Sequence, residues 1–412
     1  MRPRLVLAGL ALMLVFSAPG VLAGPRGAQA EDLPPAALAR VLYWTDGYQR
    51  WNEIARDLIW LNDVSAPRAA RVYAALSAAQ WQAWQDATRL PVFAQRDQPT
   101  ALAPPGRAPP SAPQRAASLP VAAASHAVLR ELFSADGARL DGLLDEYATS
   151  RVSAGWIQAG QIAAGLARGA QAAAPVLEHL RIDGGAESPL RGPSASGNWR
   201  SRDGEAGFDP AWGQVRPWLS GEPITISPPP APGSPEWNTD LDELRRISAN
   251  LTDEQLRIAI RWAGSADRYS PPDMWNVIAL DLLRRTGTDD ERALESLAAM
   301  NLAMADAGIA AWRIKYATGV ARPWQIDPTL ATPVRVPAFP SYPSGHSAFS
   351  WAAASVLGVL HPQARADLET QAAEASISRL YAGIHWRFDM EGGRTLGEAA
   401  ARRALTAIRL RP

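Results

Sequence analysis

Apolar residues recur every three or four positions along most of this chain, and that spacing constrains its fold more than any other feature. It is clear in residues 51–61 and again in residues 237–251. Such a period places the apolar side chains on one face of an α-helix. The alternation typical of strands is scarce, with Pro223–Ser227 as one weak exception. The 412 residues therefore predict a mainly α fold made of two packed helical bundles.

Several helix starts can be predicted from local chemistry. Ser234 followed by Pro235 suits the first turn of a helix. Thr252 with Gln255 matches a capping box, in which each residue bonds the other's backbone. Asp289 precedes a long apolar pattern that we expect to continue to Lys315.

The N-terminus resembles a secretory signal. Two arginines, Arg2 and Arg4, precede an apolar run, and small residues allow cleavage after Ala30 or after Ala23. No later stretch reaches the ~20 apolar residues that a membrane span needs. We therefore expect residues 1–30 to be removed and the protein to be exported, either to the periplasm or out of the cell.

The remaining chain is expected to divide into three regions. Residues 31–181 are predicted to be an N-terminal helical region, interrupted by a Pro/Ala-rich loop at 101–124. Residues 182–235 are rich in Gly, Ser and Pro, which favours a connection. Residues 236–412 are expected to form a C-terminal helical domain that carries the active site.

The composition excludes several kinds of site. Lys+Arg and Asp+Glu both number 41, and this balance argues against a broad basic face for nucleic acid. Cysteine is absent, which excludes disulfides, thiol nucleophiles and zinc sites built from cysteine. Lys315 is the chain's single lysine, which suggests a position where the planar fork of arginine does not fit.

The last hundred residues contain a set of groups suited to a tetrahedral oxyanion. Lys315, Arg322 and Arg379 are three cations that can each bind an oxygen atom. Ser344 and Gly345 stand where an apolar helical pattern begins, and the first N–H groups of a helix bind anions.

Two histidines accompany these groups. His385 and Asp389 are four residues apart, so on a helix the carboxylate can orient the imidazole. His346 follows Gly345 and is the candidate acid–base residue.

These residues match a known signature in three parts. Lys-x6-Arg-Pro, Pro-Ser-Gly-His and Ser-Arg-x5-His-x3-Asp occur here in order, and the chain thereby resembles the type-2 phosphatidic acid phosphatase and vanadium haloperoxidase superfamily. The resemblance implies that Lys315, Arg322, Ser344, Gly345 and Arg379 bind the oxygens of vanadate or phosphate. It implies that His385 is the vanadium ligand or the phosphohistidine nucleophile, with His346 as the acid–base residue.

The flanking residues resemble the soluble vanadium chloroperoxidase branch. That branch has a Trp three residues before the lysine and a Phe seven before the motif histidine, and these positions are Trp312 and Phe339 here. The resemblance covers roughly residues 205 to 412 and implies a halide niche at these two rings. One departure is Asp273-Met274, where Gly-His would be expected before Trp-Asn.

Three functions remain open at this point. The first is a vanadium-dependent haloperoxidase that binds vanadate and oxidises halide with hydrogen peroxide. The second is an exported acid phosphatase that hydrolyses phosphate monoesters through a phosphohistidine and needs no cofactor. The third is a non-catalytic phosphate- or vanadate-binding protein. In each case the partner is a small molecule, not a nucleic acid.

Overall fold

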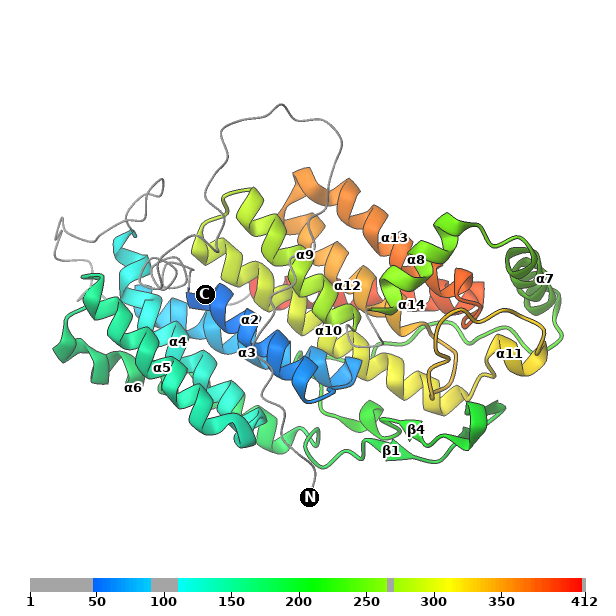
Figure 1. Ribbon diagram of the computed structural model, residues 1–412, viewed down its shortest axis with the longest axis horizontal. Coiled ribbons are helices and arrows are strands. Elements are labelled where there is room, and N and C mark those ends of the chain that lie inside the picture. The colour runs from blue at the N-terminus through cyan, green and yellow to red at the C-terminus, as the bar shows by residue number, and fades with distance from the viewer. Residues whose placement is uncertain (1–46, 90–109, 265–269, 410–412) are drawn as a thin grey trace, which may run out of the picture. The chain divides into compact units, whose positions relative to one another are not determined.

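The computed structural model describes residues 47–89, 110–264 and 270–409, which belong to a compact unit spanning residues 45–412. Helices dominate this part of the chain (Figure 1), and the mainly α fold predicted from the apolar spacing is confirmed. In chain order the helices are α2 Gly47–Leu61, α3 Ala66–Thr88, α4 Ala112–Leu132, α5 Gly137–Ser153, α6 Ile162–Ile182, α7 Pro235–Ala249, α8 Asp253–Ala263, α9 Pro271–Arg285, α10 Asp290–Thr318, α11 Pro323–Ile326, α12 Gly345–Leu360, α13 Arg365–Tyr381 and α14 Arg387–Arg409. The predicted signal at residues 1–30 lies outside the described residues.

Among the described residues, strands are short and lie in the connection between α6 and α7. Two antiparallel pairs are described there, β1 Arg191–Gly192 with β4 Gly207–Phe208 and β2 Ala195–Ser196 with β3 Trp199–Arg200. The weak strand prediction for Pro223–Ser227 is wrong, because this stretch contains no strand. Proline lacks the N–H that a ladder requires, and no neighbouring strand is placed to pair with it in the described part of the chain.

The helix starts predicted from capping chemistry are confirmed. The Ser234 hydroxyl accepts a backbone N–H at the start of α7. Thr252 and Gln255 form the reciprocal capping box of α8, and Asp289 caps α10. Lys315 lies in the last turn of α10.

The predicted loop at 101–124 is wrong over its second half, because residues 112–124 belong to α4. Ser111 and Gln114 form a capping box, and Pro113 lies in the first turn, where its missing N–H is not needed. Pro120 lies inside the helix. The small buried residues around it allow close packing, since a Cβ added at Gly169 of α6 would lie 2.4 Å from the Pro120 carbonyl oxygen. Residues 101–109 lie outside the described part.

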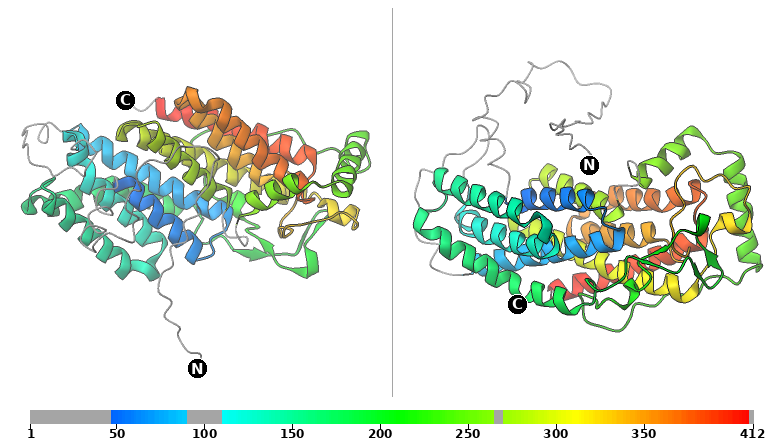
Figure 2. Two further views of the ribbon diagram at one scale, coloured as in Figure 1. Left: turned by 45° about the horizontal axis from the view of Figure 1, so that its top comes forward. Right: turned by 60° about the horizontal axis from the view of Figure 1, so that its bottom comes forward.

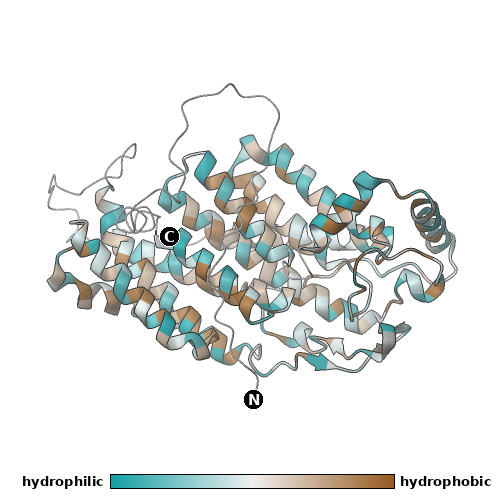
Figure 3. Ribbon diagram, in the orientation of Figure 1, coloured by the Kyte–Doolittle hydropathy of each residue, from teal (hydrophilic) through white to brown (hydrophobic). Residues whose placement is uncertain are grey.

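Helix α10 is buried along most of its length and packs against helices from both earlier and later parts of the chain. It packs against α3 on one side and against α12 and α14 on another, while α12 also packs against α13 (Figures 1 and 2). Buried residues of α3, α4, α10, α12 and α14 share one hydrophobic core. Most helices carry both hydrophilic and hydrophobic residues along their length, as expected of amphipathic helices (Figure 3).

In the three described segments, no helix combines the length and the apolarity that crossing a membrane requires.

A buried carboxylate on α10 makes the stability of this fold dependent on pH. Asp306 accepts the backbone N–H groups of Trp218 at 2.8 Å and Leu219 at 3.1 Å, and burial raises its pKa to about 6. The folded state therefore holds this proton more tightly than the unfolded chain, and its contribution to stability is lost as the pH rises from about 4 to about 6.

Asp306→Asn carries no titrating proton at this position. The free energy of unfolding of the variant, relative to the wild type, is expected to increase by up to about 3 kcal/mol between pH 4 and pH 7. Denaturant titrations of both proteins across this range provide the measurement, and the difference between them cancels the other titrating groups. A difference that stays constant with pH would contradict the raised pKa.

Candidate active site

The predicted site residues come from the ends of four packed helices and the loops between them. Lys315 is in the last turn of α10, and Arg322 precedes α11. The loop that ends at Ser344 leads into α12, and Arg379 is in the last turn of α13. The four helices that contribute these residues, α10, α12, α13 and α14, pack together.

His385, in the bend before α14, and Asp389, in the first turn of that helix, form a buried pair, so the two residues do not share one helix as their spacing would allow. His385 Nδ1 lies 2.7 Å from Asp389 Oδ2, and the two residues are 2% and 0% exposed. The same carboxylate oxygen accepts the Ser341 hydroxyl at 2.5 Å and the Trp386 N–H at 3.0 Å. A carboxylate only accepts, so Nδ1 of the neutral imidazole carries the hydrogen and Nε2 keeps its lone pair.

Arg322 lies against that lone pair. Its Nη1 is 3.1 Å from His385 Nε2 and donates to the Ile384 carbonyl at 2.6 Å, while Nε donates to the Phe339 carbonyl at 3.1 Å. Its Nη2 is buried and has no hydrogen-bond partner among the described residues. A buried donor without a partner is costly, and an oxyanion bound here would satisfy it.

Lys315 is fully buried and is held by backbone carbonyls. Its Nζ donates to the carbonyls of Pro340 at 2.9 Å, Ser341 at 2.8 Å and Pro343 at 2.5 Å. Three acceptors match the three donors of an ammonium group, whereas a planar guanidinium cannot point at all three. This explains why the chain keeps a lysine here. In this arrangement the ammonium positions the loop before α12 and contributes charge, and a direct bond to an oxyanion requires it to release a carbonyl.

Ser344 and Gly345 lie at the N-terminus of α12. Ser344 is the N-cap, and its hydroxyl accepts the N–H of Ser347. The N–H groups of Gly345 and His346 begin the helix and have no acceptor within it. A Cβ added at Gly345 would make ordinary contact with the Trp312 ring at 3.4 Å, so the protein's own packing does not demand glycine here.

Arg379 and His346 share a neighbour that the sequence did not indicate. Arg379 Nη2 donates to the carbonyl of Ala259 at 2.8 Å, and its Nε donates to Ser378 at 2.9 Å. His346 Nε2 lies 2.8 Å from the carbonyl of Trp262. Both carbonyls belong to α8. His346 is partly exposed, while the other histidine of the site is buried.

The site is buried and carries an excess of positive charge, and both features shift the pKa values of its residues. Burial lowers the pKa of His385 and of His346 well below its ordinary value, and the nearby cations lower both further. Burial and neighbouring charge likewise lower the pKa of Lys315, and burial lowers the pKa of Arg322 to about 10. Burial raises the pKa of Asp389 to about 6. An anion in this site would offset the repulsion among the cations.

Two aromatic rings border these cations. The rings of Trp312 and Phe339 lie 5.1 Å apart, and Lys315 Nζ is 4.9 Å from the Phe339 ring centre. The indole N–H of Trp312 is buried and has no hydrogen-bond partner among the described residues. Phe339 is partly exposed. The structure thus places an aromatic wall, formed by Trp312 and Phe339, beside the predicted anion-binding groups.

The sequence reasoning missed Ser341, which lies two residues before the Pro-Ser-Gly-His motif and donates to Asp389. Its position next to that motif was the available signal. The carbonyls of Ala259 and Trp262 had no sequence signal. Asp273, the departure from the family pattern, bonds Ser270 and accepts the Tyr73 hydroxyl at 3.0 Å, so it ties α9 to α3.

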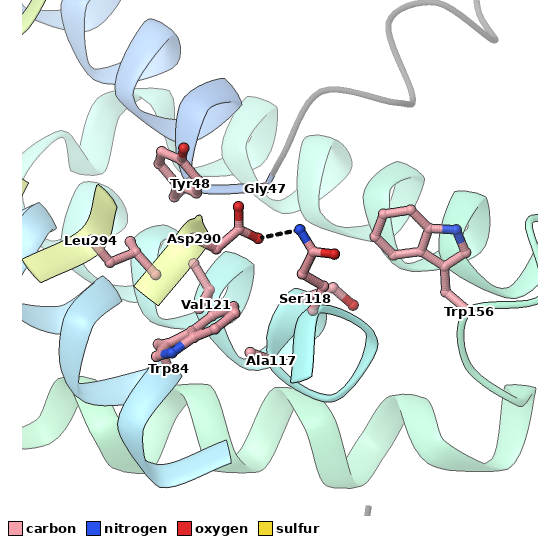
Figure 4. Close-up of a pocket in the computed structure, with 10 residues that line it drawn as sticks. Gly47, Tyr48, Trp84, Ala117, Ser118, Val121, Trp156, Asp290 and Leu294 are labelled. Atoms are coloured by element: carbon pink, nitrogen blue, oxygen red, sulfur yellow. Dashed lines mark hydrogen bonds between the residues drawn. The ribbon is translucent and has the colours of Figure 1, made fainter. Parts of the chain in front are cut away.

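Two cavities lie outside this group of residues. A cavity of about 20 Å³ among α2, α3, α4 and α10 is lined by residues that include Tyr48, Trp84 and Asp290 (Figure 4), and it is large enough for a water molecule only. A groove of about 500 Å³ is lined by Tyr342 and Phe388 together with the Pro228–Pro230 segment. Neither is lined by any of the predicted oxyanion-binding residues.

The C-terminal part of the chain is similar to known proteins. The model of the PAP2 superfamily matches residues 296–411. A non-specific acid phosphatase of Providencia stuartii is 37% identical over 60 residues, which cover 15% of this chain and 24% of that protein. One of Salmonella typhi is 40% identical over 57 residues, or 14% and 23%. This chain thus spans about a quarter of the length of the curated relatives it matches.

The likeness to solved structures extends much further along the chain. A bacterial vanadium-dependent iodoperoxidase superposes with a TM-score of 0.65 at 22% identity, covering 87% of this chain and 95% of that one. A bacterial vanadium-dependent chloroperoxidase, in its apo form, gives 0.61 at 15% identity, with 84% and 95% covered. Residues 296–411 of this chain are thus similar to the PAP2 superfamily, and the chain has the fold of the bacterial vanadium-dependent haloperoxidases.

Proposed function

We propose that this protein is a vanadium-dependent haloperoxidase that uses hydrogen peroxide to oxidise a halide. The observation that carries the proposal is the aromatic wall of Trp312 and Phe339 directly beside the buried cations. A weakly hydrated anion is favoured where positive charge meets apolar rings that exclude water. A phosphatase needs room there for an organic leaving group, which two adjacent rings restrict.

The residues present fit vanadate. The three buried cations of the site outnumber its buried carboxylate, Asp389, and the Arg322 Nη2 donor is unpaired among the described residues. His385 Nε2 offers its lone pair as a ligand atom, while Arg322, Arg379 and the first N–H groups of α12 supply donors. When bound, vanadate supplies a Lewis-acid centre that activates hydrogen peroxide toward attack by halide.

The protein's own groups have distinct tasks in this proposal. Asp389 holds His385 with Nε2 directed away from the carboxylate. Burial and the nearby cations lower the pKa of His346. The imidazole therefore stays neutral and can accept a proton from incoming peroxide. The ring of Phe339 and the indole N–H of Trp312 would receive the halide.

An acid phosphatase is the second candidate, favoured by the sequence similarity to two non-specific acid phosphatases. Here His385 Nε2 would attack phosphorus and form the phosphohistidine as the phosphorus–oxygen bond of the ester breaks. His346, in its protonated form, would give a proton to the departing alkoxide, and water would then release phosphate.

One experiment separates the candidates. The purified protein is assayed for oxidation of chloride, bromide and iodide by hydrogen peroxide, with and without orthovanadate, and for hydrolysis of p-nitrophenyl phosphate. Halide oxidation that requires vanadate supports the haloperoxidase. Ester hydrolysis that vanadate inhibits, without halide oxidation, supports the phosphatase. Binding of phosphate without either activity would leave a non-catalytic binding protein.

The aromatic wall has its own test. Phe339→Leu removes the ring that contacts Trp312 and Lys315, and the KM for halide is expected to rise about 2- to 10-fold, the usual worth of one aromatic contact. Orthovanadate affinity should stay within twofold of the wild type. Phe349→Leu is the matched control, because Phe349 also contacts Trp312 but is fully buried in the core. Equal effects of both variants on halide KM would argue against a niche at Phe339.

A further inference from the structure

The C-terminal turn of α8 supplies two acceptors to the site. The carbonyl of Ala259 accepts from Arg379 Nη2, and the carbonyl of Trp262 faces His346 Nε2, both at 2.8 Å. Ala259 and Trp262 are three residues apart and are the buried residues of this helix. The face that α8 buries is therefore the face that reaches the oxyanion-binding residues.

These contacts determine which ring nitrogen carries the hydrogen. A carbonyl oxygen only accepts, so His346 must donate from Nε2, and in the neutral ring Nδ1 then holds the lone pair. His385 shows the opposite arrangement, because its Nδ1 faces Asp389 and its Nε2 faces a guanidinium, which only donates. The two histidines are therefore opposite tautomers.

We propose that the last turn of α8 is a positioning element: the Trp262 carbonyl holds His346 as the Nε2–H tautomer, so that Nδ1 is the atom that exchanges protons in the active site. This rests on the proposed function, in either its haloperoxidase or its phosphatase form. The negative end of the helix dipole also lies at this turn, and it favours the protonated form of His346. It opposes Arg379, Lys315 and Arg322, whose charges disfavour that form.

Glu374 on α13 bonds two residues of this turn. Glu374 Oε1 accepts the indole N–H of Trp262 at 2.8 Å and also pairs with Arg261. The Trp262 ring packs near Trp275 of α9, with ring centres 6.4 Å apart. Removing Glu374 frees the indole N–H and the arginine together, so the carbonyl next to them loses its fixed position.

The tautomers can be read directly on the resting protein. The whole chain is labelled with ¹⁵N in its histidine rings, and long-range ¹H–¹⁵N spectra are recorded at pH 8, with His346→Gln and His385→Gln used for assignment. We expect hydrogen on Nε2 of His346 and on Nδ1 of His385. Hydrogen on Nδ1 of His346 in the wild type would overturn the proposal.

Variants of Glu374 test the role of the turn. Glu374→Ala is expected to give a mixture of His346 tautomers and to lower kcat about 10-fold, with KM within twofold, since the acid–base group is misplaced but not removed. Glu374→Gln keeps an acceptor for the indole and should restore one tautomer and most of kcat. Glu369→Ala is the matched control, because Glu369 lies on α13 but pairs with the exposed Arg365.

The outcomes separate positioning from function. A Glu374→Ala protein that melts at a lower temperature but keeps one His346 tautomer and full kcat would contradict the proposal. The ring nitrogens are read without substrate, so they decide the positioning even if neither halide nor phosphate ester is turned over. An active enzyme with the wrong His346 tautomer would leave the function standing and the positioning refuted.

Discussion

Replacing His385 with glutamine is expected to lower turnover by about 10³-fold or more, the largest effect of any substitution in this protein. Glutamine has a similar length but offers no ring nitrogen with a basic lone pair. In His385 that nitrogen is Nε2, which is directed away from Asp389 and lies 3.1 Å from Arg322 Nη1. The loss is expected in both candidate reactions, because His385 is the ligand atom in one and the nucleophile in the other.

Steady-state assays of the variant, with orthovanadate for halide oxidation and without it for ester hydrolysis, give the measurement. His361→Gln is the matched control. His361 is also buried and bonds Ser296, but it lies at the C-terminus of α12, at the opposite end of that helix from Ser344 and Gly345. The control should keep most of its activity, while both variants lose some stability. More than one-tenth of wild-type turnover in His385→Gln would remove His385 from the mechanism.

Replacing Arg322 with lysine is expected to weaken the binding of orthovanadate and phosphate by about 100-fold, the value of one buried charged hydrogen bond to an anion. The three nitrogens of the guanidinium have separate roles. Nε bonds the Phe339 carbonyl, and Nη1 bonds the Ile384 carbonyl beside His385 Nε2. Nη2 is unpaired among the described residues. An ammonium keeps the charge but lacks the planar fork, so it cannot retain the backbone contacts and still bind an oxyanion.

Isothermal titration with orthovanadate and with inorganic phosphate measures this loss. Arg387→Lys is the matched control, since Arg387 is close in sequence to the site but forks onto Glu243, and its affinity for both anions should be unchanged. Wild-type affinity in Arg322→Lys would mean that charge alone, and not the fork, binds the oxyanion.

The helical framework was predictable from sequence because it depends on local chemistry. Apolar residues spaced by three and four positions define helices, and capping residues such as Ser234 and Thr252 mark where they begin. The motif residues lie at fixed spacings that helix ends and tight loops preserve. The lone lysine also indicated a position unsuited to arginine, and the three carbonyls around it supply the reason.

The sequence alone misjudged features that depend on packing. Residues 112–124 were expected to form a loop because they are rich in Pro and Ala, yet small side chains pack closely against α6 and stabilise a helix there. Propensity is a weak guide where tertiary contacts compensate for it.

The sequence determined which side chains are candidates for the chemistry, and the tertiary structure decided which of their hydrogen-bonding groups remain unoccupied. Lys315 was expected to bind an oxyanion directly, but its ammonium is satisfied by backbone carbonyls, while Arg322 keeps a buried donor unpaired among the described residues. The tautomers of His346 and His385 follow from a carbonyl of α8 and a carboxylate of α14. Backbone carbonyls are the same in every residue, so only the fold determines where they point.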